Sequence, residues 1–153
     1  MDPIKISEKL ISFKSITPES NGSLEYIKKI LTKNNFSCEL LKFGNPPVIN
    51  LYANYKGGSG PRICFAGHTD VVPPGDLTNW KFNPFNPKII NGNLYGRGAS
   101  DMKSAIGAFL SATIEFINKN KNFDGSLCFI LTADEEGEAK NGTKKVVEWL
   151  KTK

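Results

Sequence analysis

Apolar positions recur along the chain in two patterns, one with a helical period and one in short continuous runs. Spacings of three and four residues predict amphipathic helices at 2–17, 23–35, 102–118 and 143–150. Runs rich in β-branched and aromatic residues predict strands at 36–43, 48–55, 63–65, 88–90, 94–95 and 126–133. Strands that alternate with helices in this way are typical of an α/β domain with a mixed, largely parallel sheet.

Two of these predicted strands are continuous apolar runs, the pattern of strands buried on both faces. They are Ile63 to Phe65 and Leu127 to Leu131. The pair Asn91-Gly92 predicts a tight hairpin turn, because both residues tolerate a positive φ. The segment 80–87 is dense in proline and aromatic residues and is either the wall of a pocket or a packed surface loop, the latter being the simpler interpretation.

A length of 153 residues with 39% hydrophobic residues fits one domain with a real core. No apolar run approaches the roughly 20 residues that a membrane span needs, and residues 1–5 lack the pattern of a secretory signal. We therefore expect a cytoplasmic protein without a membrane partner. Cys38, Cys64 and Cys128 are predicted to be reduced and structural, the latter two as small buried thiols.

The formal net charge of +5 raises the question of nucleic-acid binding. The lysines are scattered over predicted helix faces. Of 20 basic residues only Arg62 and Arg97 are arginine, the residue that reads phosphates and base edges bidentately. We therefore expect a solvated basic surface and no nucleic-acid partner.

Imidazole and carboxylate side chains gather at the ends of three predicted elements. They are His68 and Asp70 after the strand 63–65, Asp101 before the helix 102–118, and Asp134, Glu135 and Glu136 after the strand 126–133. Open α/β sheets place their sites at such an edge, so we expect these side chains to converge. His68 is the only histidine, and Asp70, two residues on, can orient it.

Each motif also has a structural alternative. Asp101 alone is best explained as a helix N-cap, a lone histidine is more often structural, and Glu135 and Glu136 alone can be surface charges. Convergence favours a metal site instead, because carboxylates on one edge repel one another unless cations neutralise them, and no local lysine cluster does so. One imidazole with several carboxylates suits zinc, cobalt or manganese, and a shared carboxylate can join two ions.

Adjacent Glu135 and Glu136 cannot point the same way from a regular backbone, so we expect different tasks for them. One can coordinate metal while its neighbour takes a proton from water. The implied reaction is hydrolysis of an amide or ester.

Together, the motifs Gly67 to Pro73, Gly96 to Lys103 and Asp134 to Gly137 resemble those of the dinuclear-zinc aminoacylase and carboxypeptidase family. The longer runs Ala66 to Asp76 and Asp134 to Thr143 are most similar to members that hydrolyse N-succinyl-LL-2,6-diaminopimelate to succinate and LL-2,6-diaminopimelate, a step toward lysine and peptidoglycan. The resemblance implies a three-layer α/β/α fold of the zinc-peptidase kind. It also implies two divalent ions, zinc or alternatively cobalt, and a homodimer acting on an N-succinyl amino acid.

Residue by residue, the resemblance implies that His68 binds one metal ion, Asp101 bridges both ions and Glu136 binds the second. Glu135 is then the general acid and base, and Asp70 orients His68. A cis peptide bond after Asp101 is implied as well.

The resemblance further implies that residues 1–153 are the N-terminal part of a catalytic domain, inactive alone. A further glutamate ligand, a histidine ligand and a dimerisation domain are then expected beyond Lys153. Three alternatives stay open. They are an N-acetylornithine deacetylase or other amidohydrolase of the family, a non-catalytic module or half of a split enzyme, and a metal-free domain whose acidic edge binds a cationic partner.

Overall fold

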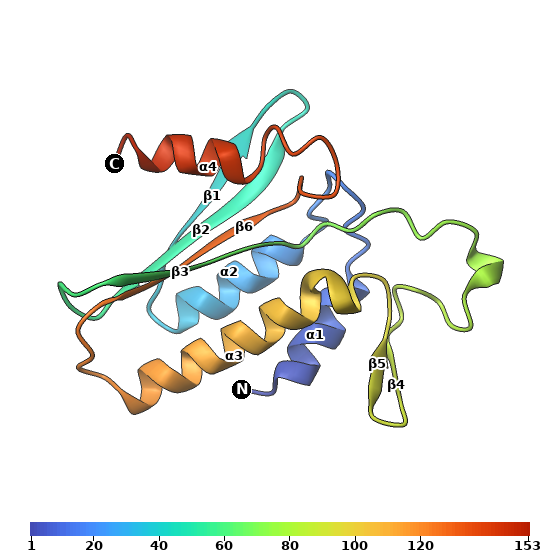
Figure 1. Cartoon of the computed structure of the whole chain (residues 1–153), viewed down its shortest axis with the longest axis horizontal. Helices are drawn as coiled ribbons and strands as arrows, with labels where there is room; N and C mark the ends of the chain where they lie inside the picture. Colours follow the sequence, from blue (N-terminus) through green and yellow to red (C-terminus); the bar gives the residue numbers. More distant parts are fainter.

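A four-stranded sheet forms the middle layer of the structure, a computed structural model that describes residues 1–153 (Figure 1). The strand order is β1 (Ser37–Phe43), β2 (Val48–Lys56), β6 (Ser126–Thr132) and β3 (Arg62–His68). The pairs β1–β2 and β2–β6 are antiparallel, whereas β6–β3 is parallel. The sheet is mixed, as predicted, with a smaller parallel share than the sequence indicated.

Helices cover both faces of this sheet, which gives three α/β/α layers (Figure 1). One face carries α2 (Ser23–Lys33) and α3 (Ser104–Lys119), with α1 (Pro3–Ser12) packed against α3, and the other face carries α4 (Thr143–Leu150). The main core lies between the sheet and the first three helices. It includes Leu10, Leu24, Ile27, Leu51, Ile106, Leu110, Phe129 and Leu131.

The N-terminal helix begins where the sequence predicts and ends earlier. The Asp2 side chain caps α1 by accepting a hydrogen bond from the Ile4 N–H at 2.8 Å. The helix ends at Ser12 because the following residues pair with the chain beyond β3. The Val71 N–H donates to the Ser15 oxygen at 2.9 Å, and the Thr17 N–H donates to the Val71 oxygen at 3.0 Å.

The edge strand β3 is not the buried strand that Ile63 to Phe65 predicted. Ile63 is 60% exposed and Cys64 is also exposed. The reason lies in the topology, because β3 has a strand neighbour on one side only and α4 packs on β6 and β2. The central strand β6, by contrast, is buried over its whole length, as predicted.

The predicted hairpin is present as β4 (Lys88–Ile90) and β5 (Asn93–Tyr95). Its turn residues Asn91 and Gly92 have φ values of 50° and 77°, the positive values that a tight two-residue turn requires. The hairpin and the short helix η1 (Leu77–Asn79) extend away from the sheet (Figure 1). None of the helices has the length and apolar character needed to cross a membrane.

Truncating Phe129 is expected to be strongly destabilising. This side chain is fully buried, and its ring centroid lies 5.4 to 6.0 Å from those of Phe36, Phe65 and Phe109. Phe129→Ala should lower the free energy of unfolding by about 3–5 kcal/mol, measured by urea denaturation. Val147→Ala, at a position that is 40% exposed, is the control and should change it by less than about 0.5 kcal/mol. Equal effects of the two substitutions would contradict the assignment of the core.

Candidate metal centre

Two parallel strands bring the candidate site together at one edge of the sheet. β3 and β6 are in register with His68 opposite Thr132, so both strands end at the same level. His68 ends β3, whereas Glu135 and Glu136 follow β6 in the next loop. Asp101 arrives from η2 (Ala99–Lys103), the kinked segment before α3. This is the edge at which the sequence predicted the site.

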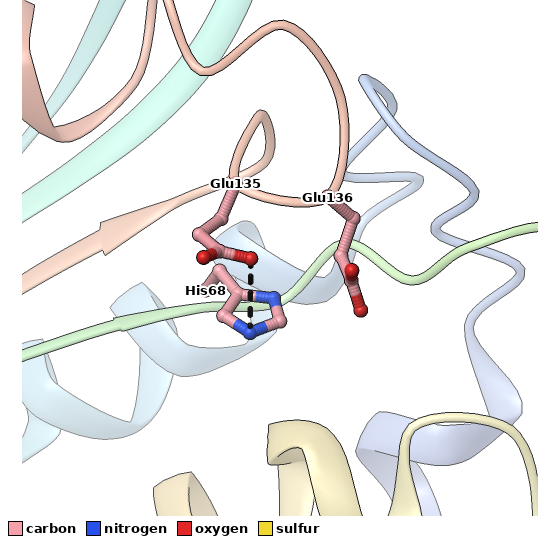
Figure 2. Close-up of side chains that lie close together, drawn as sticks. All are labelled: His68, Glu135 and Glu136. Carbon is pink, nitrogen blue, oxygen red and sulfur yellow. Dashed lines mark ion pairs between the residues drawn. The ribbon is translucent and has the colours of Figure 1, made fainter.

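The side chains of His68, Glu135 and Glu136 lie close together (Figure 2). His68 Nε2 lies 3.7 Å from Glu135 Oε2, and donor atoms of His68, Glu135 and Glu136 all lie within 4.8 Å of one another. Asp101 Oδ1 lies 3.0 Å from the same His68 nitrogen. The structure thus brings together His68, Asp101, Glu135 and Glu136, while their individual roles stay predictions.

Two aspartates of the motifs differ from simple expectations. The helix-cap interpretation of Asp101 is wrong, because α3 begins at Ser104 and its N-cap residue is Lys103. Its side chain is 72% exposed and meets His68, and the peptide bond after it is cis, as the resemblance implies. Asp134, expected among the converging carboxylates, is instead buried, and its Oδ2 accepts a hydrogen bond from the Asn141 N–H at 2.8 Å.

Asp70 is fully buried next to the inner nitrogen of His68. His68 Nδ1 lies 3.0 Å from the backbone oxygen of Asp70 and 3.5 Å from Asp70 Oδ1. Asp70 Oδ2 accepts a hydrogen bond from the Glu136 N–H at 3.0 Å. The proton on His68 Nδ1 points toward Asp70, and the other ring nitrogen, Nε2, therefore faces Asp101 and Glu135. This geometry supports the orienting role predicted for Asp70.

The charges of these groups depend strongly on one another. Burial alone would lower the pKa of His68, but its hydrogen bonds to Asp70 and Asp101 raise that pKa to about 9. Burial alone would raise the pKa of Asp70, but hydrogen bonds from His68 and the Glu136 backbone hold it below its usual value. Burial, together with the charges of Asp101 and Glu135, raises the pKa of Glu136.

The donor set fits a divalent metal ion. The exposed carboxylates of Asp101 and Glu135 and the half-buried carboxylate of Glu136 face a single imidazole, and no lysine or arginine lies within 4.0 Å of any of the three. Imidazole nitrogen with carboxylate oxygen is the ligand combination that zinc, cobalt and manganese accept. The negative charge of this edge is therefore left for a cation to neutralise.

A buried lysine, Lys103, lies near the site, and the sequence pattern did not predict it. Lys103 is fully buried, and its Nζ donates a hydrogen bond to the Phe13 oxygen at 3.0 Å. Burial lowers the pKa of Lys103 to about 8, against the attraction of the Asp70 carboxylate. Lys103 makes no ion pair with Asp70 within 4.0 Å, so this attraction acts at longer range. The only signal of Lys103 in the sequence is its position at the end of the motif 96–103.

A cavity of about 510 Å³ opens beside Asp101 and Glu136. Trp80 and Phe82 form part of its wall, and the Arg97 guanidinium lies 5.0 Å from the centre of the Trp80 ring. Residues 80–83 of the segment 80–87 therefore line a cavity, whereas residues 84–87 do not.

Residues 64–153 match the sequence profile of the Peptidase family M20/M25/M40. This match covers more than half of the chain, and the chain belongs to that family.

The chain is 51% identical over 153 residues to a succinyl-diaminopimelate desuccinylase of Wolbachia pipientis wMel. It is 49% identical over 148 residues to the enzyme of the same name from Orientia tsutsugamushi (strain Ikeda). The two alignments cover 100% and 96% of this chain but 38% of each relative. The chain thus spans well under half the length of these curated relatives.

Two solved structures share the fold at low sequence identity. Human carnosine dipeptidase 1 superposes with a TM-score of 0.83 at 21% identity. An M20 family metallo-carboxypeptidase from Sulfolobus solfataricus does so with a TM-score of 0.83 at 23% identity. Each superposition covers 99% of this chain and 35% of the other. They confirm the predicted α/β architecture.

The imidazole of His68 in the metal-free chain is expected to stay protonated through neutral pH and to titrate with a pKa of about 9. Its unfolded-state pKa is about 6.5. The raised folded-state pKa therefore stabilises the fold fully below about pH 6.5, and this contribution is lost as the pH rises through about 9. Imidazole NMR resonances measure this pKa without ambiguity, because His68 is the only histidine.

Asp101→Asn removes a charged partner and should lower the pKa of His68. Glu138→Gln is the matched control, because Glu138 is exposed and pairs with Lys140 instead. An imidazole in the parent chain that titrates at its ordinary value would contradict the ion pairs described for the site.

Proposed function

We propose that this chain contributes to the active site of a metal-dependent amidohydrolase that acts on N-succinyl-LL-2,6-diaminopimelate. The observation that carries the proposal is the meeting of His68, Asp101, Glu135 and Glu136 at the end of two parallel strands, with no lysine or arginine within 4.0 Å of the three carboxylates. The choice of substrate is supported by the relatives named succinyl-diaminopimelate desuccinylase, at about half sequence identity.

His68, Asp101 and Glu136 are the proposed ligands of two divalent ions, zinc or alternatively cobalt, with Asp101 shared between the ions. When bound, such ions polarise a carbonyl group and lower the pKa of water toward neutrality. The raised pKa of His68 means that its imidazole must release a proton before Nε2 can act as a ligand. Asp70 keeps the other nitrogen protonated and so directs Nε2 toward the site.

Glu135 is the proposed general base and acid. Its side chain is 56% exposed, lies beside His68 and accepts no hydrogen bond from the protein. A carboxylate held in this way can take a proton from the attacking water and return it to the leaving amine. The amide C–N bond breaks, the oxygen of water joins the succinyl carboxylate, and the amine leaves with the transferred proton.

The same proposal makes residues 1–153 the N-terminal part of a catalytic domain whose further glutamate and histidine ligands lie outside this sequence. It is supported by the relatives, of which the chain spans 38%. A cytoplasmic homodimer that binds a small N-succinyl amino acid is the corresponding proposal for the protein as a whole.

Turnover tests the proposed reaction directly. We expect the full-length natural protein that contains these residues to hydrolyse N-succinyl-LL-2,6-diaminopimelate in preference to N-acetylornithine. The release of the free amine measures both reactions. Glu135→Gln should lower kcat by about 10²–10⁴-fold, because it removes the proton acceptor. Glu138→Gln in the same loop is the control and should leave kcat unchanged. Exclusive use of N-acetylornithine would overturn the choice of substrate and leave the amidohydrolase assignment standing.

Zinc titration of the isolated chain tests the ligands. We expect calorimetry to detect weak zinc binding by the parent chain that His68→Ala and Asp101→Ala abolish, since each removes a proposed ligand. Glu138→Ala should bind zinc as the parent does. Equal zinc binding by all four proteins would favour the alternative in which the acidic edge holds no metal and binds a cationic partner. Robust zinc-dependent hydrolysis by the isolated chain would contradict its assignment as an incomplete part of a catalytic domain.

A further inference from the structure

Lys103 is a fully buried lysine that the proposed reaction does not use. Taking an ammonium group out of water is costly unless the interior supplies partners for it. The Lys103 side chain runs from η2 to the end of α1, where its Nζ donates a hydrogen bond to the Phe13 oxygen at 3.0 Å. No carboxylate lies within 4.0 Å of this nitrogen. A backbone group, and not an ion pair, therefore sets the place of Lys103 in the fold.

The acceptor belongs to the segment that holds the end of β3. Phe13 is the C-cap residue of α1, so its carbonyl group has no partner within that helix. Two residues further on, the Ser15 hydroxyl donates to the Thr69 oxygen at 2.6 Å, and the Ser15 oxygen accepts a hydrogen bond from the Val71 N–H at 2.9 Å. The hydrogen bond of Lys103 therefore ties η2 to the segment that also holds the chain beyond β3.

The segment η2 also packs directly against the end of β3 and the residues after it. A Cβ atom on Gly67, near the end of β3, would lie 3.1 Å from Met102 Sδ. A Cβ atom on Gly98 would lie 2.6 Å from Val71 Cγ1 and 3.3 Å from Lys103 Cδ, so the glycine lets the two segments touch. These contacts hold η2 on both sides of the imidazole that ends β3.

Asp101 lies in the middle of this held segment. Its carboxylate hydrogen-bonds with His68 Nε2 at 3.0 Å and with no backbone group of residues 1–153, so the backbone of η2 decides where it lies. The Lys103 N–H closes that backbone by donating to the Gly98 oxygen at 2.9 Å. The Lys103 side chain then fixes the closed turn to the end of α1. Asp101 thus points to the site from the same turn that Lys103 anchors in the interior.

We propose that Lys103 is a positioning residue for Asp101. Its hydrogen bond to the Phe13 oxygen holds η2 at the distance from β3 at which the Asp101 carboxylate meets His68. The inference rests on the proposed function in one respect, because it takes Asp101 as the ligand of the metal ions named there. Loss of the Lys103 ammonium is then expected to weaken metal binding, although Lys103 is not itself a ligand.

Two simpler roles for Lys103 predict different outcomes. As a cap on the end of α1 alone, Lys103 would stabilise the fold, and its loss would leave metal binding unchanged. As a positive charge alone, it would repel cations at the acidic edge, and its loss would strengthen metal binding. Only a positioning role predicts that metal binding becomes weaker when the ammonium group is removed.

The test compares Lys103→Met with the parent in the full-length natural protein, because methionine keeps an unbranched apolar stem and lacks the ammonium group. We expect the zinc affinity, measured by competition with a chelating dye, to fall about 10–100-fold. The kcat for N-succinyl-LL-2,6-diaminopimelate should fall by a similar factor, with KM within about twofold of the parent value. Zinc binding decides this inference and turnover decides the proposed reaction, so the failure of one is separate from the failure of the other.

A double-mutant cycle with Asp101→Asn tests whether Lys103 acts through Asp101. In the Asp101→Asn background, Lys103→Met should change the zinc affinity by less than about twofold, because the carboxylate through which Lys103 acts is absent. An equal loss of affinity in both backgrounds would contradict the proposal. An unchanged or increased zinc affinity of Lys103→Met alone would contradict it as well.

Leu110→Ala is the control for lost stability. Leu110 is fully buried in the main core on α3, so this variant should lower the melting temperature and leave the zinc affinity unchanged. If Lys103→Met does not fold, Lys103→Gln takes its place with the same expected zinc affinities, because its amide carries no charge and is one bond shorter. A loss of zinc affinity in Leu110→Ala equal to that in the Lys103 variant would overturn the proposal.

Discussion

The buried carboxylate of Asp70 is the interaction on which the candidate site depends. It is fully buried, faces the inner nitrogen of His68 and accepts a hydrogen bond from the Glu136 N–H at 3.0 Å. A buried carboxylate without such partners would lose its charge. The hydrogen bonds from His68 and the Glu136 N–H hold the pKa of Asp70 below its usual value, and the Glu136 contact ties the end of β3 to the loop after β6. The contact of Asp70 with His68 sets the direction of His68 Nε2.

Residues far away in the sequence hold this carboxylate in place. Beyond His68 only the Thr69 N–H still pairs with the sheet, through the Thr132 oxygen at 2.9 Å, so the other backbone polar groups of residues 69–71 need other partners. The Ser15 hydroxyl donates to the Thr69 oxygen at 2.6 Å, the Ser23 hydroxyl donates to Thr69 Oγ1 at 2.9 Å, and the Val71 backbone pairs with residues 15 and 17. The segment between α1 and α2 therefore acts as a brace for the site. This is why α1 stops at Ser12 rather than continuing along its apolar period.

Features set by neighbours in the sequence were predictable, and features set by neighbours in space were not. The hairpin at Asn91-Gly92, the buried strand β6 and the cap of α1 at Asp2 follow from local patterns. The motifs likewise indicated the four residues that meet at the site. The exposure of β3 and the pairing of Cys64 with Cys128 depend on strand order. Asp134 is used by the Asn141 backbone within the loop that follows β6, and this contact depends on the fold of that loop. Strand order brings together segments that no periodicity connects.

The charge of the site imposes a final constraint on the proposed chemistry. The carboxylates of Asp101, Glu135 and Glu136 would repel an N-succinyl substrate, which is itself an anion at neutral pH. Bound divalent cations would turn this repulsion of the anionic substrate into attraction. Lys81 and Arg97 in the wall of the adjoining cavity can add to it, because neither has a carboxylate partner within 4.0 Å that would cancel its charge. Protons compete with the metal ions at this site, because the metal-free His68 holds its proton up to a pKa of about 9. With His68 as a proposed ligand, metal binding would displace a proton from its imidazole before the site could attract the proposed substrate.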